Sequence, residues 1–440
     1  MAEAAIARVD GRVVGPRTKG LRLTEPVRLS RLRADLAARP RRLDDPMFAW
    51  PLMTLEMARL DHNIATMAAA CDRYGVWHAP HVKTAMSADI WRRQVAAGIW
   101  GVTVAMPHQL RVVRDWGAAR VVLANELLDR RELDWIVAEL GRDPGFEVWL
   151  EVDSREGADR LTGRLAAADS AVRARVHPLI EVGSAGGRGG VRQGTTALDL
   201  AGRIVAGGLA VAGVIGYEGP VGDGTSPATL AAITAWVDQV VAVANQVSAL
   251  AAGSADAGVA PSAFLVSLGG SGYLDITLPR LGALAERGWR GLVRAGAYIS
   301  HDHGHYAELN PWARLPGQAE PQAALTVWAE VLSTPEPGLA LLGAGRRDID
   351  YDLGLPHPLG WHRLTGDGAL GRRIDFVGGA TVSQLNDQHA FLLIDQAAGG
   401  PRPGDVVELG ISHPCTAFDK WQLVAVTNAQ TVIDLYPLDF

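Results

Sequence analysis

From residue 51 to residue 306 the sequence alternates between short apolar segments and segments of helix length. Leu60, Ile64 and Met67 recur at helical spacing, and this pattern ends at Gly75. The apolar segments that follow predict eight strands, at residues 76–80, 101–105, 120–124, 147–152, 176–182, 210–217, 264–267 and 291–295. Eight strand–helix units over about 250 residues match an α/β fold of the closed (β/α)8 barrel type better than an open sheet.

The pattern changes after Tyr306, where prolines interrupt any long helix. Segments at 324–332, 376–383, 390–395, 405–410 and 421–425 predict strands joined by turns. We therefore expect a barrel at 51–306 followed by a mainly antiparallel β domain at 307–440. Residues 1–50 form a separate segment with one predicted surface helix at 31–42, and packing on the β domain is one arrangement open to this segment.

The composition indicates a soluble globular protein that acts on small molecules. Hydrophobic residues make up 48% of the 440 residues, charged residues 20%, and the net charge is -6, which is neither a disordered composition nor a basic nucleic-acid footprint. The apolar stretches around 209–215 and 236–244 are too short or too interrupted to cross a bilayer. There are two cysteines, and residues 1–20 lack the pattern of a signal peptide. We expect a cytoplasmic protein without a membrane or nucleic-acid partner.

The end of the first predicted strand carries the best candidate for a catalytic lysine. The stretch reads His78-Ala-Pro-His81-Val-Lys83-Thr-Ala-Met86. In a parallel α/β fold ligands bind at the carboxyl ends of the strands. A partly desolvated lysine at that edge loses its proton more readily and can attack a carbonyl as a neutral amine. From this stretch alone, a solvated loop lysine is an equally good interpretation.

Glycine-rich loops follow the seventh and eighth predicted strands. Gly269, Gly270, Ser271 and Gly272 follow the seventh, and Gly296 with Tyr298 follows the eighth. Barrels often bind phosphate at these loops, because glycines let backbone N–H groups approach an anion. Either loop alone is also consistent with a tight turn. A reactive lysine and a phosphate cradle at one edge together indicate pyridoxal 5'-phosphate as the cofactor.

Other polar residues also follow predicted strands. Arg188 lies in a glycine run after the fifth strand and Tyr217 ends the sixth, so both are candidates for the barrel mouth. His413 and Cys415, one residue apart, offer a nitrogen and a thiolate suited to zinc, although a buried thiol beside a histidine is the simpler interpretation. The three histidines at 301–305 alternate with other residues, which favours hydrogen bonding between domains over a metal site. Residues 386–389 supply further polar groups at a loop of the second domain.

Together these residues resemble the D-serine dehydratase and D-threonine aldolase family, whose members carry pyridoxal phosphate on an alanine-racemase-like barrel followed by a β domain. The resemblance runs from about residue 51 to 421. Its strongest matches are Pro80-His-Val-Lys-Thr84, Gly269-Gly-Ser-Gly-Tyr273 and His413-Pro-Cys415. Lys-Thr-x-Met and His-Pro-Cys-Thr-x-Phe-Asp-Lys-Trp also resemble a bacterial subgroup labelled amino-acid deaminase or aldolase, which leaves the exact substrate open.

The resemblance assigns roles to the candidates. It implies that Lys83 bonds the cofactor, with His81, Arg188 and Tyr217 near it and with residues 269–272, Gly296 and Tyr298 at the phosphate. It also implies a zinc ion, or another divalent metal such as Mn²⁺, on His413 and Cys415, and a homodimer. Cys415 favours the dehydratases, because the aldolases tend to carry aspartate there. Ala85 stands where the family often has histidine, and Gln388 with His389 replaces part of a Glu-Glu-His element; these two residues are weaker candidates for substrate binding, as is Tyr217.

The activity we expect is a zinc-assisted lyase acting on β-hydroxy D-amino acids, D-serine first, giving pyruvate and ammonia. Lys83 would take the α-proton, and the metal would make the β-hydroxyl a leaving group. Cleavage of D-threonine to glycine and an aldehyde uses the same groups. An amino-acid racemase, or a pyridoxal phosphate carrier without catalytic activity, also remains open.

Overall fold

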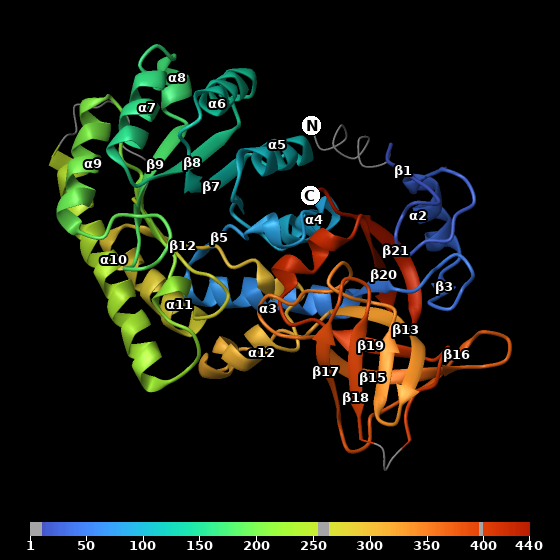
Figure 1. Cartoon of the computed structure of the whole chain (residues 1–440). Coiled ribbons are helices and arrows are strands. Elements are labelled where there is room, and N and C mark those ends of the chain that lie inside the picture. Colours follow the sequence, from blue (N-terminus) through green and yellow to red (C-terminus); the bar gives the residue numbers. More distant parts are fainter. Residues whose placement is uncertain (1–10, 254–263, 396–398) are drawn as a thin grey trace.

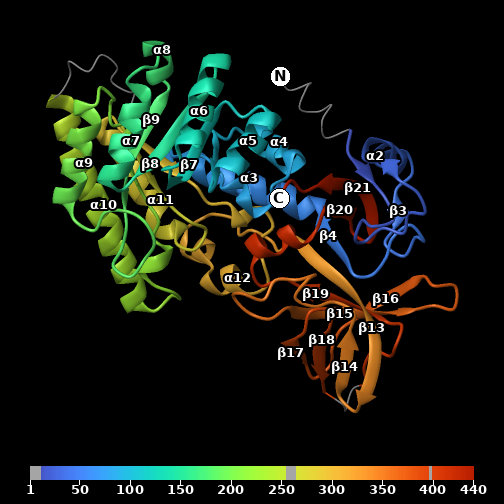
Figure 2. The same cartoon turned by 45° about the horizontal axis from the view of Figure 1, so that its top comes forward.

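The computed structural model describes residues 11–253, 264–395 and 399–440. They form an α/β barrel and a β domain, which lie side by side in Figure 1. The first described residues, which precede the barrel, lie against the β domain in Figures 1 and 2.

Eight parallel strands form the barrel within the described residues. In the sheet they follow the order β5-β12-β11-β10-β9-β8-β7-β6. Thr103 N donates to Pro80 O at 2.9 Å and His81 pairs with Thr103, which brings the two edge strands together. The strands are β5 (Trp77–His78), β6 (Val102–Val104), β7 (Arg120–Glu126), β8 (Glu147–Val152), β9 (Val176–Val182), β10 (Gly213–Gly216), β11 (Leu265–Leu268) and β12 (Arg290–Val293). All eight coincide with predicted strands, which confirms the barrel.

The barrel helices begin and end as their sequences dictate. α3 buries Leu60, Ile64 and Met67 and ends at Gly75, whose left-handed backbone (φ 63°) suits glycine. The side chain of Ser154 caps α7 by accepting a hydrogen bond from the N–H of Gly157. The helices are α3 (Met57–Tyr74), α4 (Ala88–Ala96), α5 (Pro107–Trp116), α6 (Arg130–Arg142), α7 (Arg155–Leu165), α8 (Ser170–Arg173), α9 (Gly194–Ala206), α10 (Pro227–Gly253) and α11 (Leu274–Gly282).

The interior of the barrel is closed by packed side chains. Trp149 lies edge-on against Trp100, which stacks on Trp77 with ring centroids 5.1 Å apart. These rings join a core of small and aliphatic residues from the strands: Ala79, Val122, Leu179, Ala212, Ile215, Leu265 and Leu292. The barrel is therefore filled inside, as expected for eight strands, and its ligands must bind at an end.

Helix α10 differs from its sequence expectation. Its segment Pro227–Ala251 is long and apolar enough, by length and composition, to cross a membrane. The expectation that no apolar stretch reaches that length is therefore wrong. Ile233, Val237, Val240 and Ala244 are fully buried in the main core of the molecule. A core helix of a soluble protein has the same character, and this packing accounts for the apolar face of α10.

The second sheet has eleven strands within the described residues and is antiparallel except for one pair. Its strands are β3 (Arg41–Arg42), β4 (Leu52–Glu56), β13 (Leu325–Glu336), β14 (Leu339–Leu342), β15 (His357–Leu364), β16 (Leu370–Ile374), β17 (Ala380–Leu385), β18 (Ala390–Ile394), β19 (Val406–Gly410), β20 (Leu423–Asn428) and β21 (Thr431–Pro437). β4 lies between β13 and β20. The chain therefore contributes a strand to this sheet before it builds the barrel, and the barrel begins later than residue 51.

The segment before β4 packs on the second sheet. Helix α2 (Leu29–Ala38) buries Leu29, Leu32 and Leu36 in a core shared with Trp328 and Val432. It ends two residues before Pro40, earlier than predicted, because the residue before a proline is disfavoured in a helix. The short strands β1 (Val13–Val14) and β2 (Val27–Arg28) pair with each other.

Candidate active site

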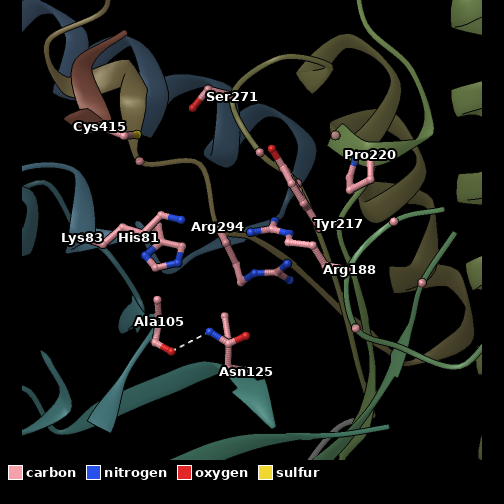
Figure 3. Close-up of a pocket in the computed structure, with 18 of the residues that line it drawn as sticks. His81, Lys83, Ala105, Asn125, Arg188, Tyr217, Pro220, Ser271, Arg294 and Cys415 are labelled. Atoms are coloured by element: carbon pink, nitrogen blue, oxygen red, sulfur yellow. Dashed lines mark hydrogen bonds between the residues drawn. The ribbon is translucent and has the colours of Figure 1, made fainter. Parts of the chain in front are cut away.

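A cavity of about 630 Å³ opens at the carboxyl ends of the barrel strands (Figure 3). Side chains from the barrel and from the second domain line it together. Of the residues singled out in the sequence, it contains His81, Lys83, Arg188, Tyr217, Gly269, Gly270, Ser271, Gly296, His413 and Cys415. Gly272, Tyr298, Gln388 and His389 are not among its lining residues.

Lys83 lies in a short 3-10 turn, η1 (Val82–Thr84), that continues β5 into the cavity. Burial lowers the pKa of its ammonium, Cys415 opposes this as a thiolate, and the charges of Arg188 and Arg294 lower it further. The neutral amine, which is the nucleophilic form, is therefore more accessible than in an ordinary surface lysine.

His81 lies beside Lys83 with an unused hydrogen-bonding group. Its Nδ1 is buried without a hydrogen-bond partner. Burial lowers the pKa of His81 well below its ordinary value, and the charges of Lys83 and Arg294 add to this effect. The ring is neutral near pH 7. A buried nitrogen without a partner, in an otherwise polar cavity, fits a bound organic cofactor that supplies the missing partner.

The two glycine loops close tightly around the cavity. A Cβ on Gly296 would lie 2.3 Å from the carbonyl oxygen of His81, and a Cβ on Gly270 would lie 2.6 Å from the ring of Tyr217. The absence of side chains thus lets the loops approach the Lys83 turn and the Tyr217 ring. This part of the cavity has the closeness expected of a phosphate cradle.

The donors within the first glycine loop differ from those predicted. The buried carboxylate of Glu218 accepts hydrogen bonds from Gly269 N at 3.1 Å and Gly270 N at 2.7 Å. These two backbone N–H groups already donate to Glu218 and are therefore not free to bind a phosphate. Ser271 and Gly296, which also line the cavity, remain as candidates for the phosphate.

The side chain of Tyr298 does not point into the cavity. It is 2% exposed and accepts a hydrogen bond from Gln94 Nε2 at 2.9 Å. Gln388 and His389 lie exposed in the loop between β17 and β18, where Gln388 Nε2 donates to Asp348 Oδ2 at 2.9 Å. In this chain, neither residue of that loop lines the cavity.

Arg294 is the main residue that the sequence analysis left unassigned. Arg294 lies beside Arg188 in Figure 3. Its buried guanidinium donates to Ser267 Oγ at 2.6 Å and to Gly216 O at 2.9 Å. Two carboxylates, Glu151 and Glu181, line the cavity nearby; burial and mutual repulsion raise the pKa of Glu151, and burial likewise raises that of Glu181. In the sequence, Glu151, Glu181 and Arg294 are each a charged residue in or directly after the last part of an otherwise apolar strand, and this pattern could have identified them.

His413 and Cys415 meet on the wall contributed by the second domain. They flank Pro414 at the turn η7 (Pro414–Thr416), and their side chains are hydrogen-bonded. Burial opposes charge on both, but their interaction lowers the pKa of the Cys415 thiol and, with Asp352, raises that of His413 to about 9. Thr84 Oγ1 lies 3.4 Å from Cys415 Sγ, which joins this turn to the Lys83 turn.

This pair fits an open metal site. The described residues contain no group of three or more His, Cys, Asp and Glu side chains placed to hold a metal ion. Imidazole nitrogen and thiolate are ordinary zinc ligands, and a catalytic zinc keeps positions for water or substrate. His413 and Cys415 would supply two ligands and leave the others open.

The histidine-rich segment at 301–305 holds the two domains together. His303 N donates to Ile411 O at 2.9 Å and His305 N to Ser412 O at 3.1 Å, next to the metal pair. The Asp302 carboxylate accepts from Gly304 N and Tyr306 N, each at 3.0 Å. This fixes helix α12 (His305–Leu309), and Tyr306 lines the cavity with its ring centroid 6.2 Å from that of His413.

Comparisons with known proteins show what the chain is similar to. Residues 324–427 match the model of a putative serine dehydratase domain, a segment that contains His413 and Cys415. A D-threonine aldolase of Arthrobacter sp. is 25% identical over 398 residues, which cover 88% of this chain and 91% of that enzyme. A D-threo-3-hydroxyaspartate dehydratase of Delftia sp. strain HT23 is 30% identical over 127 residues, 24% of this chain and 33% of that enzyme.

Solved structures share the two-domain fold. A D-threonine aldolase from Filomicrobium marinum superposes with a TM-score of 0.69 at 24% identity, over 91% of this chain and 98% of that one. A D-threo-3-hydroxyaspartate dehydratase from Delftia sp. HT23 gives 0.65 at 22% identity, over 89% and 97%. An alanine racemase from Bartonella henselae with covalently bound pyridoxal phosphate gives 0.54 at 13% identity, over 85% and 97%. The chain is thus similar, in sequence and in fold, to lyases of the D-serine dehydratase and D-threonine aldolase type.

Proposed function

We propose that this chain is a zinc-dependent dehydratase of β-hydroxy D-amino acids, with D-serine as the first substrate. The observation that carries the proposal is that Lys83 and the His413–Cys415 pair line one cavity, with Thr84 in contact with Cys415. A lysine able to bond a carbonyl and a pair of metal ligands, in one cavity, suit a reaction at two adjacent carbons of one substrate.

The residues present suit both groups that this reaction needs. Lys83 would hold pyridoxal phosphate through its amine, with the unpaired Nδ1 of His81 as one partner and with Ser271 and Gly296 for the phosphate. His413 and Cys415 would hold Zn²⁺, or Mn²⁺ as the alternative.

When bound, the cofactor supplies an electron sink for the charge left at Cα, and the metal supplies a Lewis acid for the β-oxygen. Once the substrate's amine has taken its place on the cofactor, the freed amine of Lys83 would take the α-proton as general base, and its lowered pKa leaves more of it unprotonated than an ordinary lysine. Tyr217 and Tyr306 also line the cavity. The α-proton and the β-hydroxide leave as the elements of water, and the enamine that remains hydrolyses to pyruvate and ammonia.

Two solved variants of D-threo-3-hydroxyaspartate dehydratase support a metal. One replaces a histidine by alanine, and the other replaces a cysteine two positions later and is in the metal-free form. His413 and Cys415 have the same spacing. A small-molecule partner, a homodimer and a cytoplasmic location are proposed with this function, on the family resemblance and the composition.

Aldolase activity is the second candidate, favoured by similarity to the Arthrobacter D-threonine aldolase over nearly its full length. It would use the same residues. A base would remove the β-hydroxyl proton and the Cα–Cβ bond would break, giving glycine and an aldehyde. Cys415, where the resemblance expects aspartate in an aldolase, favours the dehydratase.

The test is product analysis on the purified protein with pyridoxal phosphate and Zn²⁺. D-serine, D-threonine and D-threo-3-hydroxyaspartate are incubated separately, with L-serine as control, and keto acid, ammonia, glycine and aldehyde are all assayed. Keto acid with ammonia from the D-enantiomers alone is the expected result. Glycine with aldehyde would replace the dehydratase by the aldolase, and α-proton exchange without either product would point to a racemase. If turnover survives complete removal of divalent metal, the role given to zinc is wrong.

A further inference from the structure

We infer that Asp352 is a positioning residue for the metal pair: its carboxylate orients His413 and fixes the turn that carries Cys415. The inference rests on the proposed function in one respect, namely that His413 and Cys415 bind a metal ion. It concerns how the protein prepares this pair before the metal arrives.

The first oxygen of Asp352 acts on the histidine. Oδ2 lies 2.8 Å from His413 Nδ1. A carboxylate can only accept at this distance, so the Nδ1 atom carries the proton. The other ring nitrogen, Nε2, is then the atom that faces a metal and binds it on losing its own proton. The same contact fixes the rotation of the ring.

The second oxygen of Asp352 binds the residue that follows Cys415 in the sequence. Oδ1 accepts a hydrogen bond from Thr416 Oγ1 at 2.6 Å. Thr416 is the last residue of η7, directly after Cys415. One carboxylate thus bridges the residues at 413 and 416 and encloses Cys415 between its two contacts. The side chain of Asp352 is 42% exposed, so these bonds, rather than burial, account for its position.

Asp350, two residues before Asp352, acts on the backbone of the same loop. Asp350 Oδ2 accepts from Ser412 N at 2.9 Å and from His413 N at 2.6 Å. Asp348 anchors its own segment through Gly345 N and Lys19 Nζ. Asp350 and Asp352 therefore hold successive parts of the loop 412–416, and Asp352 is the one that reaches the ligand side chain.

A pair of ligands that is already oriented binds a metal more tightly, because the conformational entropy of the two side chains is lost during folding and not when the metal binds. Loss of a partner that orients a metal-ligating histidine typically weakens metal affinity about 10–100-fold. We expect a loss in this range for Asp352→Asn, and a smaller loss for Thr416→Val, which keeps the contact with His413.

The experiment measures metal binding by the pyridoxal phosphate-loaded protein after its metal has been removed by chelation. Zn²⁺ affinity is obtained by competition with a chromophoric chelator, and Co²⁺ is used as a second probe through its thiolate charge-transfer absorption. Asp367→Asn, an aspartate in the exposed turn between β15 and β16, is the matched control and should bind both metals as the wild type does. Excess Zn²⁺ should restore turnover of Asp352→Asn, since no group that touches substrate is changed.

A Zn²⁺ affinity of Asp352→Asn within about twofold of the wild type would overturn the inference and leave the proposed function standing. Circular dichroism checks that the variant folds; if it does not, Thr416→Val decides, and unchanged affinity in that variant overturns the inference. If the wild type itself binds neither Zn²⁺ nor Co²⁺, the metal part of the proposed function fails, and the inference fails with it.

Discussion

At the scale of single residues, Lys83 is set apart from the other two lysines of the chain, Lys19 and Lys420. It lines the cavity, whereas Lys19 binds carbonyl oxygens and Asp348, and Lys420 lies over the ring of Tyr351. Only Lys83 therefore combines access to the cavity with a lowered pKa.

We expect borohydride reduction of the cofactor-loaded protein to fix pyridoxal phosphate on the peptide that contains Lys83, because a neutral, accessible amine is needed for the bond. Lys83→Ala should carry no label and lose turnover by at least about 10³-fold. Lys420→Ala should be labelled like the wild type. Peptide mass spectrometry identifies the modified residue, and label on Lys19 or Lys420 in the wild type would contradict the assignment.

Glu151 makes the stability of the protein depend on pH. Burial and repulsion from Glu181 raise its pKa from 4.5 to about 8. The folded carboxyl keeps its proton up to about pH 8, whereas the unfolded one releases it above about pH 4.5, so stability falls as pH rises across this window. Glu151→Gln should remove this loss and gain roughly 1–3 kcal/mol over the wild type between about pH 5 and pH 8.

Urea unfolding at a series of pH values measures this effect. The exposed Glu156→Gln variant, on helix α7, is the control and should follow the wild type at every pH. If the free energy of unfolding changes with pH in the same way for Glu151→Gln and the wild type, Glu151 is ionised in the folded protein and the prediction is wrong.

Much of the site could be predicted from residue types at strand ends. Lys83, Arg188, Tyr217 and the metal pair share the cavity because the carboxyl ends of parallel strands meet at one edge. Side-chain direction could not be predicted. Tyr298 turns away to Gln94, and Glu218, from the neighbouring strand end, takes two amides of the glycine loop. Both outcomes depend on contacts between segments far apart in the sequence.

At the scale of elements, the turn after β12 lies directly against the Lys83 turn. Gly296→Ala would place a Cβ 2.3 Å from His81 O and 2.9 Å from Thr84 Oγ1. The backbone must shift, so we expect cofactor affinity to fall by about tenfold or more. Gly163→Ala, in helix α7 with open space around it, is the control and should be neutral or stabilising by about 1 kcal/mol. Fluorescence titration with pyridoxal phosphate measures both, and an unchanged affinity of Gly296→Ala would rule out this close contact as a requirement.

The elements of the barrel were easier to predict than those of the second sheet. Strands buried on both sides are short apolar runs separated by helices, and all eight are visible in the sequence. β16 has mostly exposed positions, and β15 carries Pro358 next to its start, so neither has a strong strand pattern. β4 is apolar and precedes a barrel helix, but its place between β13 and β20 is a pairing over a long sequence distance.

At the scale of the whole molecule, Lys19 connects the N-terminal segment to the segment around Asp348 and to Lys420, a few residues after His413 and Cys415. Its Nζ donates to Arg347 O at 2.7 Å, Asp348 Oδ1 at 2.9 Å and Lys420 O at 3.1 Å. Lys19→Ala would leave the buried Asp348 carboxylate without its cation. We expect a loss of about 2–3 kcal/mol in the free energy of unfolding. Denaturant titration checks this against the exposed Arg17→Ala, and equal stability of the two variants would refute it.

The position of β4 also affects how the molecule is made. Leu55 pairs with Leu325 in the finished sheet, so during translation this strand leaves the ribosome long before its partner exists. Until β13 and β20 have been synthesised, the backbone hydrogen-bonding groups of β4 are open to pairing with other chains. A gene fragment for residues 307–440 alone would lack the strand between β13 and β20 and expose both of their edges. The chain therefore cannot be divided at one position into two fragments that each contain a complete sheet, so the two domains must be encoded together.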